Sequence, residues 1–314
     1  MTLLVDVHMH LYTSEDSAQF SLEGYEISEY GSKAGVRFAN ASGAIEDAAA
    51  LLARSDLAHA VIVNLFAADL FRDEAVAGLA TALDAEERRR EVEKITAGLG
   101  DAMVRINEWL MAATRDRRDF TPFVAIDPHV RTADENVAHL REMAGCGARG
   151  VKIHPVLQRF FPEDPRMIPV YQTCVELGLT VLSHSGRNHD GEQWAAPSSF
   201  VPVMEQVPDL HLVLAHLGGG AWRETLDFAT AFPTVTFDLS EIVHWLGASE
   251  SLSASAFVEL VRSVGVERVM LGSDYPWYDP IETFEILTAL PGFSEGEVDA
   301  IAGLNAATIL ELPL

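Results

Sequence analysis

The sequence predicts a single-domain α/β protein folded as a (β/α)8 TIM barrel. Short β-branched segments alternate eight times with helix-period segments along the 314 residues. The predicted strands that begin at Phe120, Gly150, Thr180 and His211 are 30, 30 and 31 residues apart, the length of a strand–helix unit. An open doubly wound sheet is the alternative, but it usually has a glycine-rich turn after its first strand, where this chain has His8-Met9-His10.

The predicted strands are short, and those at 180–184, 211–215 and 268–273 are mostly apolar, as expected of parallel strands buried on both faces. The other predicted strands are 3–7, 60–64, 120–126, 150–154 and 235–239.

The predicted helices are 45–55, 69–114, 133–144, 168–177, 198–206, 222–232, 253–264 and 281–290, with further terminal helices in 291–314. The segment 12–44 exceeds what a strand–helix turn needs, so we expect an insertion after the first strand. No linker divides the chain, so one domain spans 1–314.

The composition argues against several classes of function. Lys and Arg total 22 against 47 Asp and Glu, a net charge of −25, which repels nucleic acid and anionic membranes. Two cysteines cannot build a disulfide framework, and no apolar run reaches the ~18 residues of a membrane span. We therefore expect a cytoplasmic protein that acts on a small molecule.

Ligand-type side chains stand at the carboxyl ends of several predicted strands, where barrel enzymes place their functional groups. Strict alternation along the first strand puts Asp6, His8 and His10 on the inward face and Val5, Val7 and Met9 outward, under the helices. Two histidines spaced i and i+2 converge on one cation, although a pair of hydrogen-bonded turn histidines has the same spacing.

Four further strand ends carry the same kinds of residue. Lys152 and His154 end the fourth predicted strand, and a buried ion pair competes with a functional role for the lysine. His184 ends the fifth strand, His216 the sixth and Asp274 the eighth, where an N-cap is the alternative role for the aspartate.

Three histidines and an aspartate suit Zn²⁺ or a similar divalent metal with an open coordination position. Such a metal lowers the pKa of bound water to ~7 and polarises carbonyl groups. Asp274 and His216 are the predicted catalytic groups, as acceptor of the water's proton and as acid or base on the opposite side.

These motifs resemble the metal-dependent amidohydrolase superfamily, and more narrowly its amidohydrolase-2 branch of aminocarboxymuconate-semialdehyde decarboxylase-like barrels. The resemblance runs in order from Val5-Asp-Val-His-Met-His through Gly150-Val-Lys-Ile-His-Pro, Leu182-Ser-His-Ser-Gly and Leu214-Ala-His-Leu-Gly-Gly to Leu271-Gly-Ser-Asp-Tyr-Pro. It covers nearly the whole chain.

The resemblance implies that His8, His10, His184 and Asp274 bind the metal. In mononuclear relatives the residue corresponding to His216 acts in catalysis, and in binuclear relatives it binds a second metal. Lys152 stands on the strand that supplies a carboxylated lysine bridge in binuclear relatives, so two ions are the alternative to the single ion we expect. Relatives often place a substrate-binding arginine in the segment after the first strand, where Arg37 is the one arginine. Relatives are also often dimers, so a homodimer is expected.

Hydrolysis of a C–O or C–N bond in a small carboxylated substrate, such as a lactone or amide, is the first predicted function. Nonoxidative decarboxylation on the same fold is the alternative, and a binding protein without chemistry is a third. Lys152, His154, Arg159 and Arg187 are predicted substrate contacts, since the two arginines would pair with a substrate carboxylate if they faced the metal.

Overall fold

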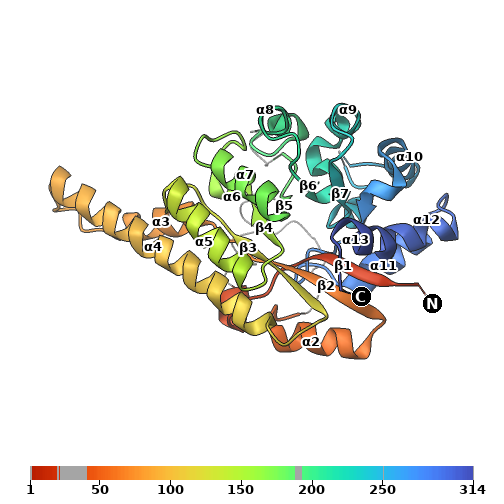
Figure 1. Cartoon of the computed structure of the whole chain (residues 1–314), viewed down its shortest axis with the longest axis horizontal. Helices are drawn as coiled ribbons and strands as arrows, with labels where there is room; N and C mark the ends of the chain where they lie inside the picture. Colours follow the sequence, from red (N-terminus) through yellow and green to blue (C-terminus); the bar gives the residue numbers. More distant parts are fainter. Residues whose placement is uncertain (1, 20, 22–40, 188–192, 250, 314) are drawn as a thin grey trace.

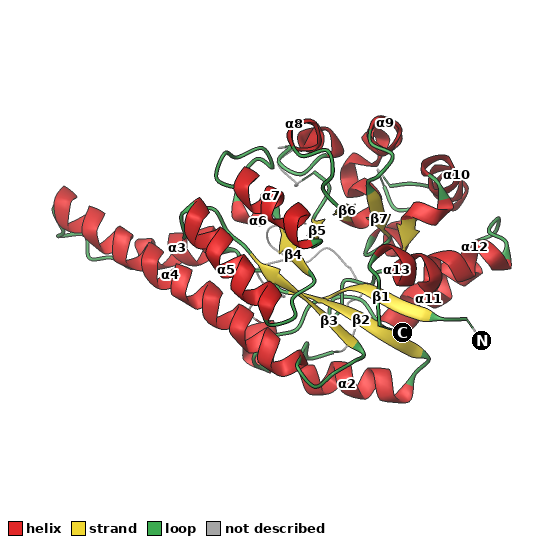
Figure 2. Ribbon diagram, viewed as in Figure 1, coloured by secondary structure: helices red, strands yellow, loops and turns green. Residues whose placement is uncertain are grey.

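The computed structural model describes residues 2–19, 21, 41–187, 193–249 and 251–313. Eight parallel strands follow one another around the sheet in chain order, with helices on the outside (Figures 1 and 2). This arrangement confirms the predicted TIM barrel. The strands are β1 (Leu4–Met9), β2 (Leu57–Val63), β3 (Phe120–Ala125), β4 (Gly150–Ile153), β5 (Thr180–Ser183), β6 (Leu212–Leu214), β7 (Thr236–Asp238) and β8 (Val269–Met270).

Helices connect each strand to the next and close the chain. The α-helices are α2 (Ile45–Arg54), α3 (Ala68–Ala77), α4 (Ala85–Thr114), α5 (Ala133–Gly145), α6 (Pro155–Gln158), α7 (Ile168–Leu177), α8 (Val201–Gln206), α9 (Thr225–Ala231), α10 (Ala254–Val264), α11 (Pro280–Ala289), α12 (Glu295–Asp299) and α13 (Asn305–Ile309). Further helical segments, of 3-10 or π type, are η1 (Pro197–Phe200), η2 (Ala215–Glu224), η3 (Ile242–Trp245), η4 (Val266–Arg268) and η5 (Ala300–Leu304).

The barrel closes between β1 and the segment after β8 through individual hydrogen bonds. Val7 N donates to Leu271 O at 3.0 Å, and Asp274 N donates to His8 O at 2.9 Å. The β8 ladder ends earlier than the sequence predicts, because Leu271 N turns to the Ile301 carbonyl of η5 at 2.8 Å. Closure therefore brings the end of β8 directly against the histidines of β1.

The prediction of one helical segment over 69–114 is wrong, because two helices occupy it. The helix α3 ends at Ala77, before Gly78, and α4 begins after Asp84. Asp84 accepts hydrogen bonds from the amides of Glu86 and Glu87, and the Glu87 carboxylate accepts from Asp84 N at 3.0 Å. This capping box starts a new helix regardless of the helix-forming residues that precede it. The helix α4 then extends well beyond the barrel (Figure 1).

The strict alternation predicted for β1 is also wrong. The pairing of β1 with β2 shifts register between Asp6 and Met9. As a result Val5 and Val7 join the cluster of Val61, Phe123, Leu182 and Val213, capped by residues of α13, while Met9 packs in the larger helix-facing core. A register shift places neighbouring residues on the same face, which is why Val7 and His8 no longer alternate.

Asp6 is consequently a core polar group. Its carboxylate accepts hydrogen bonds from Ser273 N at 3.0 Å, from His8 N at 2.9 Å and from the Ser273 hydroxyl. Burial raises the pKa of Asp6 to about 7. Asp6 contacts the backbone amide of His8 and not its imidazole, so the Asp6 carboxylate holds the β1 backbone in place without orienting the His8 ring.

Asn107 anchors α4 to the end of β3 inside the wall of the barrel. Its side chain donates to Ala125 O and accepts from Ala125 N, both at 2.8 Å, and its Nδ2 lies 3.0 Å from His139 Nε2. These bonds satisfy backbone groups where the β3 ladder ends. They also hold Ile106 and Trp109 of α4 over the carboxyl end of the barrel, where both line a cavity.

Most of the predicted insertion 12–44 lies outside the described residues. Its two ends meet, since Tyr12 N donates to Gly43 O at 3.0 Å and Tyr12 pairs with Ala44. Both cysteines are free thiols, with Cys174 buried and Cys146 exposed. In the part of the chain that the structure describes, every helix is too short or too polar to cross a bilayer.

Candidate metal centre

The carboxyl ends of five strands bring seven ionisable side chains into one small cavity. Each of the seven is at most 5% exposed. They are His8, His10, Lys152, His154, His184, His216 and Asp274, and Leu65 and Trp277 complete the lining. All the strand-end histidines, the lysine and the aspartate singled out in the sequence therefore gather here. Arg159 and Arg187 do not line this cavity.

Three non-glycine residues at or next to this centre have a positive φ angle. The φ angles of His216, Glu241 and Asp274 are 60°, 63° and 68°. Such residues are uncommon and concentrate at functional sites, where the surrounding structure holds the side chain in a required direction. Asp274 is not the cap of the last barrel helix, because Asp279 accepts the hydrogen bonds from the first amides of α11.

The turn after β6 depends on glycine. Gly219 has φ 49° and ψ −131°, and a Cβ there would lie 2.7 Å from the Ser185 carbonyl oxygen. The turns after β5 and β6 can therefore pack closely, which holds His184 beside His216. This is the close backbone approach that the three consecutive glycines predict.

His8, His10 and Asp274 form a group whose ligand atoms all lie within 4.8 Å of one another. Asp274 Oδ1 is 3.1 Å from His10 Nε2 and 3.5 Å from His8 Nε2. Burial and the nearby lysine lower the pKa of His8 to about 4, and burial lowers that of His10. Burial opposes ionisation of Asp274, but the field of His8 and the hydrogen bond from His10 hold its pKa below the usual range. Neutral imidazoles and an ionised carboxylate are the protonation states that a divalent cation requires.

Asp238, at the end of β7, contacts the opposite edge of the His8 ring. Its Oδ2 lies 3.0 Å from His8 Nδ1, and its Oδ1 accepts from the backbone amides of His216 and Ser240, both at 3.0 Å. A carboxylate can only accept, so Nδ1 of His8 carries the proton and Nε2 presents its lone pair to the centre. Sequence reasoning missed this residue. The signal was its place at the carboxyl end of the predicted strand 235–239.

His184 stands apart from the three converging ligands. Its ring stacks on His154 with centroids 3.8 Å apart, and its Nδ1 lies 3.1 Å from His216 Nε2. His184 Nε2 is buried and has no hydrogen-bond partner among the described residues. Burial, together with the His154 and His216 rings, holds the pKa of His184 well below its usual range.

Lys152 lies beneath the ligands, with Nζ 2.9 Å from His8 Nε2. Burial lowers the pKa of its ammonium group to about 8. The side chain is 1% exposed and its hydrogen-bond contact is with His8, a candidate metal ligand. Among the described residues, no carboxylate forms the ion pair with Lys152 that the sequence offered as an alternative.

The donor set fits a divalent cation. Two imidazoles and one carboxylate converge from two strands, and an unpartnered imidazole nitrogen of His184 is buried in the same cavity. His, His and carboxylate ligands with an open position are typical of catalytic divalent sites. A second group of potential ligands, His216, Glu241 and Asp274, shares the same aspartate.

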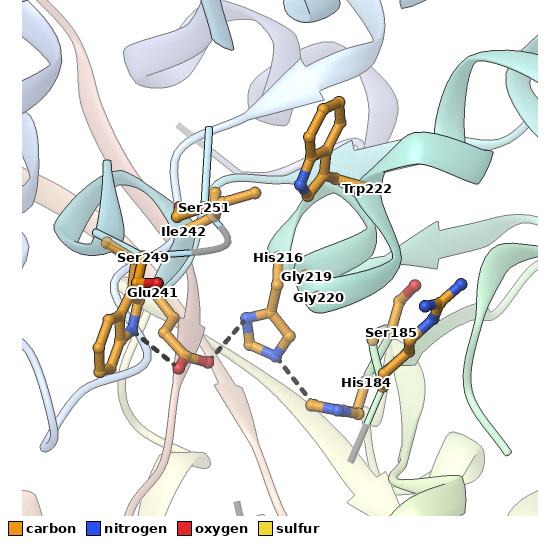
Figure 3. A pocket seen from close by; sticks show the side chains of 13 residues that line it. His184, Ser185, His216, Gly219, Gly220, Trp222, Glu241, Ile242, Ser249 and Ser251 are labelled. Carbon is orange, nitrogen blue, oxygen red and sulfur yellow. Dashed lines mark hydrogen bonds and ion pairs between the residues drawn. The ribbon is translucent and has the colours of Figure 1, made fainter. Parts of the chain in front are cut away.

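Two cavities of different character adjoin the centre. The first, about 230 Å³, is lined by His184 and His216, which also line the centre, and by Arg187, Glu241, Ser249 and Ser251 among others (Figure 3). The second, about 600 Å³, shares His10 and Trp277 with the centre.

In Figure 3 a dashed line joins the Glu241 carboxylate to the His216 ring. Glu241 Oε1 accepts from Trp245 Nε1 at 3.0 Å, and its Oε2 lies 3.8 Å from His216 Nδ1. His216 Nδ1 also lies 3.0 Å from the Ser240 carbonyl oxygen. The His216 ring thus spans the boundary between the buried centre and the polar cavity.

The two predicted substrate arginines form ion pairs near the surface. Arg159 pairs with Asp73 and is 44% exposed at its side chain. Arg187 pairs with Glu224 at 3.2 Å and is 45% exposed, at the rim of the polar cavity. The other two predicted contacts, Lys152 and His154, line the centre itself. Arg37 lies outside the described residues.

A family model described as Amidohydrolase, of the amidohydrolase-2 type, matches residues 5–312. The chain belongs to the amidohydrolase-2 family. The match spans all eight strands and every strand end that contributes to the centre. Membership makes the chain a relative of metal-dependent enzymes, as the motifs in the sequence suggest.

Individual relatives are more distant. A 2-amino-3-carboxymuconate-6-semialdehyde decarboxylase from Dictyostelium discoideum is 23% identical over 206 aligned residues. The alignment covers 55% of this chain and 57% of that relative's length. A TIM-barrel protein from Bordetella bronchiseptica has a TM-score of 0.69 at 17% identity, covering 98% of each chain. A 5-carboxyvanillate decarboxylase from Novosphingobium aromaticivorans, solved with manganese and a nitrobenzoic acid derivative, has a TM-score of 0.64 at 13% identity, covering 99% and 96%.

We expect Asp238→Asn to weaken binding of a divalent metal 10–100-fold, because the amide no longer fixes the protonated nitrogen of His8 as firmly. Titration of the metal-free protein with Zn²⁺ and Mn²⁺ in a competing chelator measures this change. Asp209→Asn, at an exposed position, is the matched control and should bind metal as the unaltered protein does. Unchanged affinity in Asp238→Asn would contradict the orienting role.

Proposed function

We propose that the protein is a metal-dependent, nonoxidative decarboxylase of a small carboxylic acid. The observation that carries the proposal is the burial of all seven ionisable groups of the centre, next to a cavity lined mainly by apolar residues. Loss of CO2 moves the charge from the well-hydrated carboxylate onto the substrate carbon and leaves CO2 neutral, so a site shielded from water favours it. The names of the decarboxylases to which the chain is similar support the same choice over hydrolysis.

The reaction replaces one bond. The carbon–carbon bond to the carboxylate breaks, its electron pair stays on the substrate carbon, CO2 leaves, and a proton from a protein side chain takes the vacant position. No oxidant or reductant is needed.

His8, His10, Asp274 and His184 are the proposed ligands of one divalent ion per chain. When bound, the ion would hold the anionic substrate and withdraw electron density from it. Zinc is the ion that the donor types in the sequence suggest, and manganese is named in one structural neighbour.

The remaining side chains have separate tasks in this proposal. The Lys152 ammonium, buried beside the ligands, pairs with the substrate carboxylate and offsets its loss of hydration. His216 delivers the proton, since its Nε2 faces the centre and its Nδ1 edge faces Glu241 and the polar cavity. Glu241 stands between that cavity and His216, so a proton from solvent can replace the one consumed.

Metal-loaded protein should release CO2, measured as bicarbonate, from carboxylic acids in a screen that also includes lactones and amides. Metal-free protein and the His8→Ala variant should release none, because the ion is lost while the barrel core remains. Ring opening of a lactone or cleavage of an amide without CO2 release would replace this proposal with the hydrolase alternative.

His216→Asn should keep its metal and its fold but lose about 10²–10⁴-fold in turnover, the usual cost of removing a general acid or base. Metal content and turnover are measured on the same preparation. If metal and activity disappear together, His216 is a ligand and the single-ion assignment fails. If activity is retained, the proton comes from another group.

A further inference from the structure

The larger cavity beside the metal centre has a lining that restricts the substrate. Its volume is about 600 Å³. It is enclosed by the loops after β1 and β2, by α3 and α4, and by single residues of α6 and of the loop after β8. Cavities of ~300–1,000 Å³ are those that enclose drug-sized ligands, so this one holds more than a single ring.

The cavity opens into the metal centre. His10, Leu65 and Trp277 line both spaces, and the rings of His10 and Trp277 meet edge to face with centroids 5.0 Å apart. A molecule bound at the ion therefore has this cavity as the space for the rest of its body.

The inner wall is apolar and aromatic. Phe66 and Phe71 lie against each other with ring centroids 5.4 Å apart, and Leu70, Ile106 and Trp109 extend the surface. Rigid aromatic walls of this kind bind flat or ring-containing apolar groups by burying apolar surface area and by ring stacking.

Among the described residues that line this cavity there is no lysine or arginine. Its polar members are His10, the buried Asn64 and a group in the segment after β1, which includes the carboxylate of Asp16. A second carboxylate on the substrate would lose its hydration here and face a negative charge. The arginines predicted to select carboxylates lie elsewhere, paired with Asp73 and Glu224.

The other cavity beside the centre differs in its charged residues. It is smaller, at about 230 Å³, and its lining includes Arg187, Glu241 and three serines. The two sides of the centre therefore favour one orientation, with the apolar body of the substrate toward α3 and α4 and its carboxylate at the ion.

From this geometry we propose that the substrate is a monocarboxylic acid without a second anionic group. The rest of the molecule is apolar, and its hydrophobic surface area is larger than that of a single aromatic ring. This inference builds on the proposed decarboxylase function and specifies its substrate class. It excludes dicarboxylates, which an arginine-lined site would select.

Three acids with the same ortho-hydroxy carboxylate head test the proposal: salicylate, 3-hydroxy-2-naphthoate and 4-hydroxyisophthalate. Calorimetric titration into the metal-loaded protein should give at least tenfold tighter binding for the naphthoate than for salicylate, and at least tenfold weaker binding for the dicarboxylate. Equal or tighter binding of the dicarboxylate would overturn the proposal.

Phe71→Arg supplies the missing cation on the cavity wall. It should reverse the order, weakening the naphthoate and strengthening the dicarboxylate, each at least tenfold. Phe161→Arg makes the same substitution at a residue that is 48% exposed and outside the lining, and it should leave all three affinities unchanged. An unchanged order in Phe71→Arg would contradict the assignment of the cavity.

Arg37→Ala tests the arginine outside the described residues. The proposal requires the order of the three acids to survive this substitution. A preference for the dicarboxylate that disappears with Arg37 would overturn the proposal and assign recognition to that residue.

Binding and turnover separate the two levels of inference. Tight naphthoate binding without CO2 release would refute the decarboxylase function and leave the substrate class standing. CO2 release with a preference for the dicarboxylate would support the decarboxylase function and refute the proposed substrate class.

Discussion

The hydrogen bond between His8 Nδ1 and Asp238 Oδ2 joins the first and seventh strands and decides which ring nitrogen of His8 faces the centre. A similar argument applies on the other wall. The Ser240 carbonyl can only accept, so His216 Nδ1 donates to it, and this bond turns Nε2 of His216 toward His184 Nδ1, 3.1 Å away. His184 Nε2 has no partner among the described residues. Asp238 and Ser240, at the β7 end, thus orient the rings of His8 and His216 on the two walls of the centre.

The sequence located the centre because a parallel barrel brings the carboxyl ends of all its strands to one rim, so the residues at the predicted strand ends must lie close together. The sequence could not show that Asp238 orients the His8 ring, because the two residues are 230 positions apart along the chain. The direction of Val5 and Val7 also depended on pairing with β2, where a register shift overrides the alternation of the β1 sequence. The sequence could not predict the surface ion pairs of Arg159 and Arg187 either, because their partners Asp73 and Glu224 lie 86 and 37 positions away along the chain.

The two cavities lie on different sides of the metal centre and have different linings, so the two sides of the barrel's carboxyl-terminal rim are not equivalent. The apolar side is built on α3 and α4, whose separation by the Asp84 capping box the sequence did not predict. Asn107 fixes α4 to the β3 end, so the wall that carries Trp109 is rigidly connected to the barrel. On the polar side, the positive φ angles of Glu241 and His216 aim both side chains at the boundary between solvent and the buried centre.

The location of the ion tests the account most directly. Anomalous diffraction from crystals of the manganese-loaded protein should give one strong peak per chain, within bonding distance of His8, His10 and Asp274. A peak bound instead by His216 and Glu241, or a pair of peaks bridged by Lys152, would contradict the single-ion centre from which the proposed chemistry follows.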